Sequence, residues 1–419
     1  MRLLSKCRRA ACVLPLLATL GCDAAHAADN IVPVEVRQLL QGDSFNRLFV
    51  DVMVCHDAQH CRSVPNVLVD TGSAGLRLFR PALYALSLDP VTDLVGHALG
   101  NWARFGAGDL WGTLHWAQVR IGGLATTAAI PIGLYDLPAP HERLPAGYGD
   151  RDLRGTMLGN GILGIAPWRH SMASHFAFVG AGRAASAADW KPVQLETSQM
   201  LVNPIGHFPA PYDNGSVISL PEVDWFQGQS RVQGWLGFGL GPPTEVLFPR
   251  GHRVIVHELD GRGEFRATVG GRPIDLMLDS GSNMLSLDLE ALGFARHPYY
   301  PGYYQAATLT PIDMAVQCAA QEIKLVQRLY VGSADNVGHT LRGHAVLPMV
   351  AAWPVQQEGK EAKNLLGLPF FYGRAVATGL EGVINPYLEA SSASALQGAD
   401  DAGADRAVAS RYGFVAYSD

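Results

Sequence analysis

The sequence predicts an all-β protein built from two similar halves. Its 419 residues include 46 Gly and 26 Pro, a composition typical of a turn-rich β protein rather than a helical bundle. Two stretches also repeat each other, VLVDTGSAGL around Asp70 and LMLDSGSNML around Asp279. The length is sufficient for two domains with separate cores. We therefore expect two β lobes that each contribute one carboxylate to a shared site.

Each repeat is an apolar run followed by Asp, a hydroxyl residue, Gly and Ser. An apolar run of this length predicts a buried strand that ends in a tight turn. The strand delivers a carboxylate to the turn, the Gly lets the backbone fold back closely, and the hydroxyls can hydrogen-bond the acid. One such match is typical of an ordinary strand-ending turn, whereas two matches behind two apolar runs are rarely accidental. The duplication thus indicates Asp70 and Asp279 as the functional acids.

The first 27 residues have the pattern of an export signal: a basic cluster, an apolar stretch over 10–20, and small residues. Two cleavage sites compete. Ala25-His26-Ala27 fits cleavage before Ala28, whereas Thr19-Leu20-Gly21-Cys22 resembles a lipoprotein signal with Thr19 where an aliphatic residue is usual. We favour the first, with lipid anchoring at Cys22 as the alternative. No later apolar stretch is long enough to span a bilayer, so we expect a periplasmic or secreted protein.

Cleavage there removes four basic residues and one acidic residue, leaving 28 Lys and Arg against 37 Asp and Glu, a net charge of −9. An acidic chain has no electrostatic case for binding nucleic acid or anionic lipid. Hydrophobic residues at 48% and charged residues at 17% are typical of an ordinary globular protein. We therefore expect no nucleic-acid partner.

Three cysteines remain after cleavage: Cys55, Cys61 and Cys318. Export permits a disulfide, and the closeness of Cys55 and Cys61 favours a bridge that staples the hairpin leading into the first Asp turn. The segment Cys55-His56-x3-His60-Cys61 can also be read as a metal cluster, but five intervening residues in an exported hairpin fit a disulfide better. We therefore expect no metal, and Cys318 as an unpaired, buried small hydrophobe.

Further strand and turn signals order the rest of the chain. Gly106, Gly108 and Gly112 predict a bent, mobile hairpin with a return strand over 113–121. The apolar runs NGILGIAP at 160–167 and NLLGLPFF at 364–371 mirror each other. In the second half, HRVIVHEL and FRATV predict a meander. The closing GFVAY predicts a last strand that returns to a sheet.

The order of these features resembles that of the pepsin-like aspartic peptidases over most of the chain after the signal. It also resembles an uncharacterised group of exported bacterial proteins of that type. The matching features, in order, are Asp70-Thr71-Gly72-Ser73, a glycine-rich flap at 105–112, Ile162-Leu163-Gly164, Asp279-Ser280-Gly281-Ser282 and Leu365-Leu366-Gly367. The resemblance implies a bilobal pepsin-like double barrel. Its signal peptide would cover 1–27, its N-terminal lobe 28–213 and its C-terminal lobe 214–419.

The resemblance implies an exported, monomeric aspartic endopeptidase that binds an extended peptide with apolar side chains beside the scissile bond. Asp70 and Asp279 would share a proton and activate a water, with no metal, cofactor or covalent intermediate. By the same resemblance, Ser73 and Ser282 would hydrogen-bond the outer oxygens of the two acids. The other residues supporting the dyad and those covering the substrate would be Thr71, Gly72, Ser280 and Gly281, and Phe105, Gly106, Ala107, Gly108 and Asp109 of the flap.

Two positions depart from the family. Pepsin-like enzymes have a flap Tyr bonded to a Trp after the first Asp turn, and the matching residues here are Phe105 and Arg77. Their joint change predicts that Arg77 packs over the Phe105 ring. It also keeps open a second function, a non-hydrolytic cell-envelope protein that binds peptide or glycan. A serine hydrolase is disfavoured because no Gly-x-Ser-x-Gly setting occurs, and a glycosidase would not explain two matched Asp turns.

Overall fold

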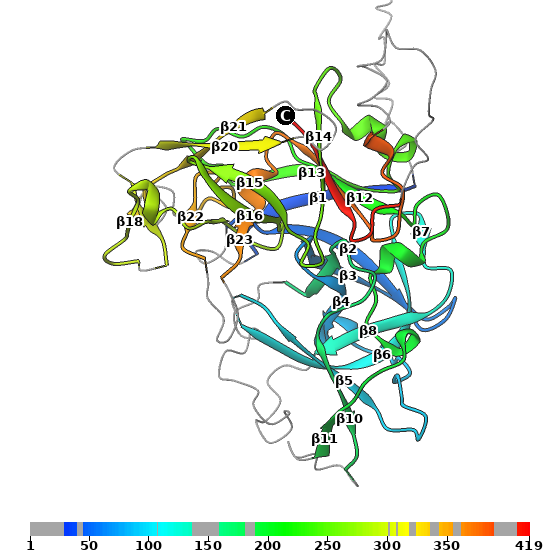
Figure 1. The fold of residues 1–419 in the computed structure, drawn as a ribbon. Coiled ribbons are helices and arrows are strands. Elements are labelled where there is room, and N and C mark those ends of the chain that lie inside the picture. Colours follow the sequence, from blue (N-terminus) through cyan, green and yellow to red (C-terminus); the bar gives the residue numbers. More distant parts are fainter. Residues whose placement is uncertain are drawn as a thin grey trace, which may run out of the picture.

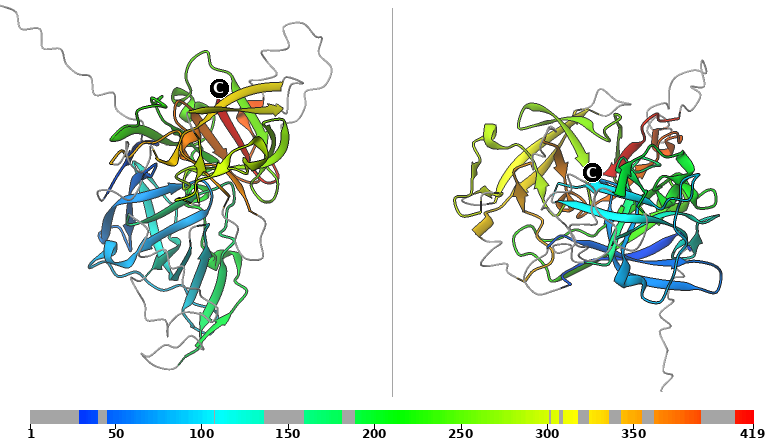
Figure 2. Two further views of the ribbon diagram at one scale, coloured as in Figure 1. Left: turned by 90° about the vertical axis from the view of Figure 1, so that its left-hand side faces the viewer. Right: turned by 90° about the horizontal axis from the view of Figure 1, so that it is seen from below.

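In the computed structural model, almost all regular structure is β-strand. The residues that the structure describes are 29–39, 45–106, 108–135, 159–180, 189–300, 302–306, 309–317, 324–335, 343–354, 362–388 and 409–419. The expected signal peptide, Cys22, Ala107 and Cys318 lie outside these ranges. The strands gather into two bodies, one of blue and cyan strands and one of yellow and orange strands, in all three views (Figures 1 and 2). The observed class is the all-β, bilobal, pepsin-like double barrel that the sequence predicts.

The N-terminal lobe is one continuous sheet folded around apolar side chains. Its strands are β2 (Leu48–Cys55), β3 (Cys61–Asp70), β4 (Ala74–Phe79), β5 (Leu99–Arg104), β6 (Asp109–Ile121), β7 (Leu124–Ala125), β8 (Ile130–Tyr135), β9 (Gly161–Ile165), β10 (Ser174–Phe178) and β11 (Trp190–Pro192). β3 runs parallel to β9, which is antiparallel to β4, and Asp70 faces Gly164 in this register. The first Asp turn is therefore clamped between two strands of its own sheet.

The C-terminal lobe repeats this arrangement. Its strands are β14 (Val254–Glu258), β15 (Phe265–Val269), β16 (Arg272–Leu278), β17 (Leu285–Ser286), β18 (Ala295–Arg296), β19 (Tyr304–Gln305), β20 (Thr310–Gln317), β21 (Lys324–Val331), β22 (Ala351–Ala352) and β23 (Asn364–Leu366). β16 runs parallel to β23, which is antiparallel to β17. β3, β4 and β9 stand in the same relation, so the mirrored apolar runs serve the same purpose in both halves.

A third group of strands joins the lobes: β1 (Ile31–Arg37), β12 (Gly215–Ser219), β13 (Arg231–Phe238), β24 (Ala375–Gly379) and β25 (Phe414–Ser418). In the sheet order β1-β13-β12-β24-β25-β14, β1 also pairs with β2 of the N-terminal lobe. The strand predicted from GFVAY does return to a sheet, as β25. Six short 3₁₀ helices are described: Arg80–Leu83, Thr197–Gln199, Pro204–His207, Pro242–Leu247, Glu290–Leu292 and Leu368–Phe370.

One strand prediction is wrong. HRVIVHEL and FRATV do not form a meander, because β14 pairs with β25 whereas β15 pairs with β16 and β20. A turn over Asp260–Gly263 carries the chain from one sheet to the other, and its strands bury alternate side chains in different sheets. Alternation identifies a half-buried strand but does not identify its partner.

Cys55 and Cys61 form the predicted disulfide at the end of the β2–β3 hairpin. The bridge uses both thiols, so neither is available to a metal. In the described part of the chain, no helix is long and apolar enough to cross a membrane.

Candidate active site

Each candidate acid stands where a buried strand ends. The side chains of Val67 to Val69, which lead into Asp70, are almost fully buried, as are those of Leu276 to Leu278 before Asp279. In both turns the glycine two residues on donates its backbone N–H to the Oδ1 of the acid, from Gly72 over 2.8 Å and from Gly281 over 2.9 Å. The repeated sequence therefore folds into two repeated turns.

The two turns are locked to each other across the lobes. The backbone N–H of Thr71 donates to Ser280 Oγ (3.1 Å), and that of Ser280 donates to Thr71 Oγ1 (2.9 Å). Each hydroxyl then donates to the carbonyl before the opposite acid, Thr71 to Leu278 and Ser280 to Val69, over 2.9 and 2.8 Å. Thr71 and Ser280 are both buried. Buried, satisfied groups of this kind hold two segments in a single relative position.

This lock brings the two carboxyl groups face to face. A Cβ placed on Gly281 would lie 2.6 Å from Asp70 Oδ1 and 3.1 Å from Asp279 Oδ1. A Cβ on Gly72 would lie 2.6 Å from Asp279 Oδ1. Each glycine thus makes room for the acid of the opposite lobe. Both acids reach the same small space, although 209 residues separate them in the sequence.

The electrostatics of the pair favour retention of one proton. The pKa of Asp279 is raised well above its usual value, first by burial, then by the charge of Asp70 and by a hydrogen bond between the two carboxyl groups. The backbone N–H groups of Gly281 and Ser282 oppose this shift without cancelling it. Two carboxylates this close cannot both be ionised at low cost, so one holds a proton.

The outer supports of the two acids differ. Ser73 Oγ donates to Asp70 Oδ2 over 2.5 Å, which is the contact expected from the resemblance. The matching expectation for Ser282 is wrong, because its hydroxyl donates to the carbonyl oxygen of Met284 over 3.2 Å. Its backbone N–H reaches Asp279 Oδ1 instead (3.2 Å). A nearby carbonyl satisfies the hydroxyl, so only Asp70 has a hydroxyl donor from its own turn.

The apolar-apolar-Gly segments lie directly behind the turns. A Cβ on Gly164 would lie 2.6 Å from the carbonyl oxygen of Ser73, and one on Gly367 would lie 2.1 Å from that of Met284. The backbone N–H of Asp279 donates to the carbonyl of Leu366 over 3.1 Å. Because only glycine fits at these distances, the two segments support the turns through close backbone contact.

The flap is the β5–β6 hairpin with its tip at 105–108. Phe105 and Gly108 close the tip with reciprocal backbone hydrogen bonds of 2.7 and 3.2 Å. Gly106 is exposed, Phe105 and Asp109 are partly buried, and Ala107 lies outside the described residues. β10 and β11 continue the sheet beyond β5, and there the Trp111 ring lies 4.8 Å from the Trp190 ring. The base of the flap is therefore supported and its tip remains accessible.

Arg77 packs beneath the flap tip as predicted, with its guanidinium 5.6 Å from the centre of the Phe105 ring. It is only 2% exposed, and it donates to the carbonyl oxygens of Ala74 and Gly75 and to Ser171 Oγ. Arg77 thus ties the turn after Asp70 to the flap. The polar pair expected from the resemblance is replaced by a cation and an aromatic ring.

One residue of the site is not predicted from the sequence. Arg47 Nη1 donates to the carbonyl oxygen of Gly281 over 3.1 Å, and the charges of Asp279 and Asp70 both act on it. Burial lowers the pKa of Arg47, and the two carboxyl groups oppose that effect. No motif in the sequence marks this arginine, because it lies 234 residues from Gly281.

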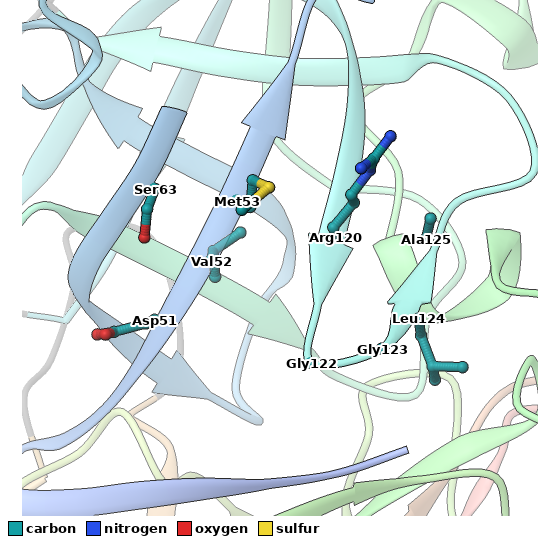
Figure 3. Close-up of a pocket in the computed structure, with 9 residues that line it drawn as sticks. All are labelled: Asp51, Val52, Met53, Ser63, Arg120, Gly122, Gly123, Leu124 and Ala125. Atoms are coloured by element: carbon teal, nitrogen blue, oxygen red, sulfur yellow. The ribbon is translucent and has the colours of Figure 1, made fainter. Parts of the chain in front are cut away.

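Elsewhere, a surface groove of about 400 Å³ lies between β2 and the β6–β7 turn (Figure 3). Two charged side chains line this groove: Asp51 accepts a hydrogen bond from the Asn66 N–H, and Arg120 donates one to the Gln118 side chain. Neither candidate acid lines the groove. Among the described residues, no group of three or more His, Cys, Asp or Glu could hold a metal ion.

A family model described as "Protein of unknown function (DUF3443)" matches residues 26–394. No curated protein matches the chain. Among solved structures, the crystal structure of an aspartic proteinase from Irpex lacteus is similar with a TM-score of 0.48 and 15% identity, over 83% of this chain and 93% of that chain. A likeness of that degree carries over no residue roles.

Proposed function

The chain belongs to the family described as "Protein of unknown function (DUF3443)", a description that names no activity, and we propose from the geometry of its candidate site that it is an aspartic endopeptidase. Asp70 and Asp279 would hydrolyse a peptide bond through a water held between them. The observation that carries the proposal is the cross-lobe lock of Thr71 and Ser280, which fixes two acids at one point. A binding cleft alone does not require two carboxyl groups in contact.

The mechanism uses the two protonation states of the pair. We assign the proton to Asp279, whose pKa is raised by burial and by Asp70, and the ionised role to Asp70, which accepts from the Ser73 hydroxyl and the Gly72 N–H. Asp70 would take a proton from the water as its oxygen attacks the peptide carbonyl. Asp279 would donate its proton to the developing oxyanion, giving a neutral diol. As the C–N bond breaks, Asp70 would pass the proton taken from the water to the leaving nitrogen, and Asp279 would regain a proton from a diol hydroxyl.

The flap supplies the remaining requirement, which is exclusion of bulk water. An extended peptide would lie between the flap tip and the dyad, with Phe105 and the backbone of Gly106 and Gly108 over it. Closure of such a hairpin strengthens electrostatic interactions inside the site. Ala107 and Asp109 belong to the same proposed contact.

The setting of the enzyme is part of the proposal. The Cys55–Cys61 disulfide fits an oxidising compartment, and the N-terminal pattern is that of an exported chain. We propose a monomer acting in the periplasm or outside the cell on extended peptides or proteins, not on nucleic acid. Lipid anchoring at Cys22 is the alternative mode of localisation.

The test compares the wild type with Asp70→Asn and Asp279→Asn on a broad library of quenched octapeptides between pH 3 and pH 8. The wild type is expected to cleave, and both variants to lose at least about 1,000-fold in kcat/KM while keeping a cooperative thermal transition. Asp288→Asn, an exposed residue outside the site, serves as the matched control. Activity retained by either dyad variant would refute the assignment.

One observation favours a second function. Phe105 lacks a hydroxyl, so the flap tip cannot donate the hydrogen bond that a tyrosine would offer, and a non-hydrolytic protein that binds peptide or glycan in the cleft is the alternative. Saturable binding of an octapeptide or an oligosaccharide, without turnover at any pH from 3 to 8, would favour this alternative.

A further inference from the structure

The segment that precedes β2 crosses from the N-terminal lobe to the C-terminal lobe. Asn46 is fully buried there, with a left-handed φ of 50°. Its side-chain amide donates to the carbonyls of Asn283 and Leu347, and its oxygen accepts from the Leu347 N–H and the Tyr372 hydroxyl. These bonds, of 2.8 to 2.9 Å, anchor the segment against the second Asp turn. Asn46 thereby determines where the next side chain points.

That next side chain is Arg47, which contacts the second Asp turn at Gly281. One nitrogen donates to the Gly281 carbonyl, and the site of a Gly281 Cβ is within 3.1 Å of oxygens from both acids. The residue is partly exposed. Among the described residues it makes no ion pair within 4.0 Å and no other side-chain hydrogen bond. Within the described ranges, most of its five N–H donors therefore have no protein acceptor.

The wall beside Arg47 is apolar. Leu347, which binds Asn46, packs with Met349 and Val350, and a rim of partly buried side chains surrounds these three. The rim consists of Phe45, Trp225, Met284, Tyr303 and Leu309. The charged or titratable groups that act on Arg47 are Asp279, Asp70 and the Tyr303 phenol. One partly exposed cation thus lies in apolar surroundings, where charge selectivity is strong.

We propose that Arg47 makes the enzyme prefer peptides with an acidic side chain next to the scissile bond, an inference that rests on the proposed peptidase function. A dyad with one proton carries one negative charge and alone would repel a substrate carboxylate. Arg47 cancels that charge, and its unused donors can hold a carboxylate through two parallel hydrogen bonds. If Arg47 served only to bind the Gly281 carbonyl, a neutral side chain with a single N–H donor would be sufficient.

The experiment uses three matched libraries of quenched octapeptides with Glu, Gln or Lys fixed at the two central positions. At pH 6, where a free Glu is ionised, the wild type is expected to show kcat/KM about tenfold higher for the Glu library than for the Gln library. Arg47→Gln should remove this preference, bringing the ratio of the Glu value to the Gln value close to one. Arg47→Lys should keep part of it, and Arg47→Glu should favour the Lys library. Below about pH 4 the wild-type preference should disappear, because Glu becomes neutral.

Arg62→Gln, an exposed cation on β3, is the matched control and should leave the preference unchanged. Thermal melting checks that the Arg47 variants fold, and Arg47→Lys retains a donor for the Gly281 carbonyl. Equal cleavage of the Glu and Gln libraries by the wild type, or an unchanged preference in Arg47→Gln, overturns the inference while the peptidase function stands.

If the wild type cleaves no library at any pH, the peptidase function fails separately. Fluorescence anisotropy then measures the Kd of labelled Glu and Gln octapeptides for the same proteins. Tighter binding of the Glu peptide that Arg47→Gln abolishes supports Arg47 as the selecting residue. Equal Kd values for the two peptides overturn that role.

Discussion

Thr71 and Ser280 exchange backbone-to-hydroxyl hydrogen bonds across the two lobes, over 3.1 and 2.9 Å. Each hydroxyl also donates to a carbonyl of the opposite strand, so the four bonds form a closed set with every buried partner satisfied. Because Asp70 precedes Thr71 and Asp279 precedes Ser280, these bonds also fix the positions of the two acids. The geometry of the dyad is thus decided by two side chains that do not themselves react.

The first prediction concerns this lock. Thr71→Val keeps the shape but removes the hydroxyl, so the Ser280 N–H and the Leu278 carbonyl lose their partner inside the protein. At about 1–3 kcal/mol for each buried unsatisfied group, we expect the free energy of unfolding to fall by about 2–4 kcal/mol. Thr71→Ser retains the hydroxyl and serves as the control. Chemical denaturation should separate the two variants, and equal midpoints would contradict the closed set of bonds.

The second prediction concerns the glycines of the turns. In Gly72→Ala and Gly281→Ala the new methyl group would lie 2.6 Å from an oxygen of the opposite acid, closer than such atoms approach. The acids must move apart, and we expect kcat/KM to fall at least about 100-fold, because displacement of about 1 Å is enough for such a loss. Gly302→Ala meets no atom within 4 Å and is the control. Activity of Gly72→Ala within about threefold of the control would show that the spacing of the acids is not critical.

Much of this site could be predicted from the sequence, because its signals are local. Each Asp turn, its buried strand and its supporting glycine segment lie within short stretches whose apolar pattern and Gly placement specify a strand and a close turn. The contact of Arg77 with Phe105 could also be predicted, because Arg77 follows the first Asp turn closely and Phe105 begins the glycine-rich flap. The fold class follows from the same repeated local units.

What could not be predicted depends on distant partners. Arg47 reaches the site only because Asn46 bonds Leu347, which lies 301 residues further along the chain. The Ser282 hydroxyl donates to the Met284 carbonyl and not to the Asp279 carboxyl, and the sequence does not rank these two acceptors. Likewise, Val254–Glu258 alternates as any half-buried strand does, and its partner is the strand at the end of the chain.

The third prediction concerns pH. The folded protein favours neutral Asp279, since burial and Asp70 raise its pKa. Its contribution to stability is therefore fully present below the unfolded pKa of about 3.9 and is lost as the pH rises through the raised folded pKa. Asp279→Asn remains neutral at every pH, so its melting temperature relative to the wild type should rise by about 2 °C or more between pH 4 and pH 7.

Two further measurements bear on the same group. Wild-type activity should decline on the alkaline side as Asp279 loses its proton, because the reaction needs one protonated member of the pair. Asp288→Asn controls for the general loss of a carboxylate. If the difference in melting temperature between Asp279→Asn and the wild type is the same at pH 4 and pH 7, the assignment of a shared proton to the two acids is wrong.

The fourth prediction concerns Arg77 and Phe105. Arg77→Met removes the donors to two buried carbonyls and to Ser171, and should lower the free energy of unfolding by about 2–4 kcal/mol. Phe105→Leu removes only the ring over the cation, at a cost of about 1 kcal/mol. The double variant should then be more stable than the sum of the two changes implies, by about 0.5–1 kcal/mol. Strict additivity in denaturation experiments would mean that the contact contributes nothing.

The fifth prediction concerns the Cys55–Cys61 bridge, which closes a short loop with a sequence separation of 6. On the chain-entropy model such a loop contributes about 2 kcal/mol, so Cys55→Ala with Cys61→Ala should lower the free energy of unfolding by that amount. Reduction of the wild type should produce the same loss, whereas the double variant should not respond to the reductant. Peptide cleavage should persist in both cases, because the hairpin end makes no hydrogen bond to either acid. A loss of cleavage at a temperature where the reduced protein is still folded would mean that the bridge acts on the dyad and not only on the unfolded chain.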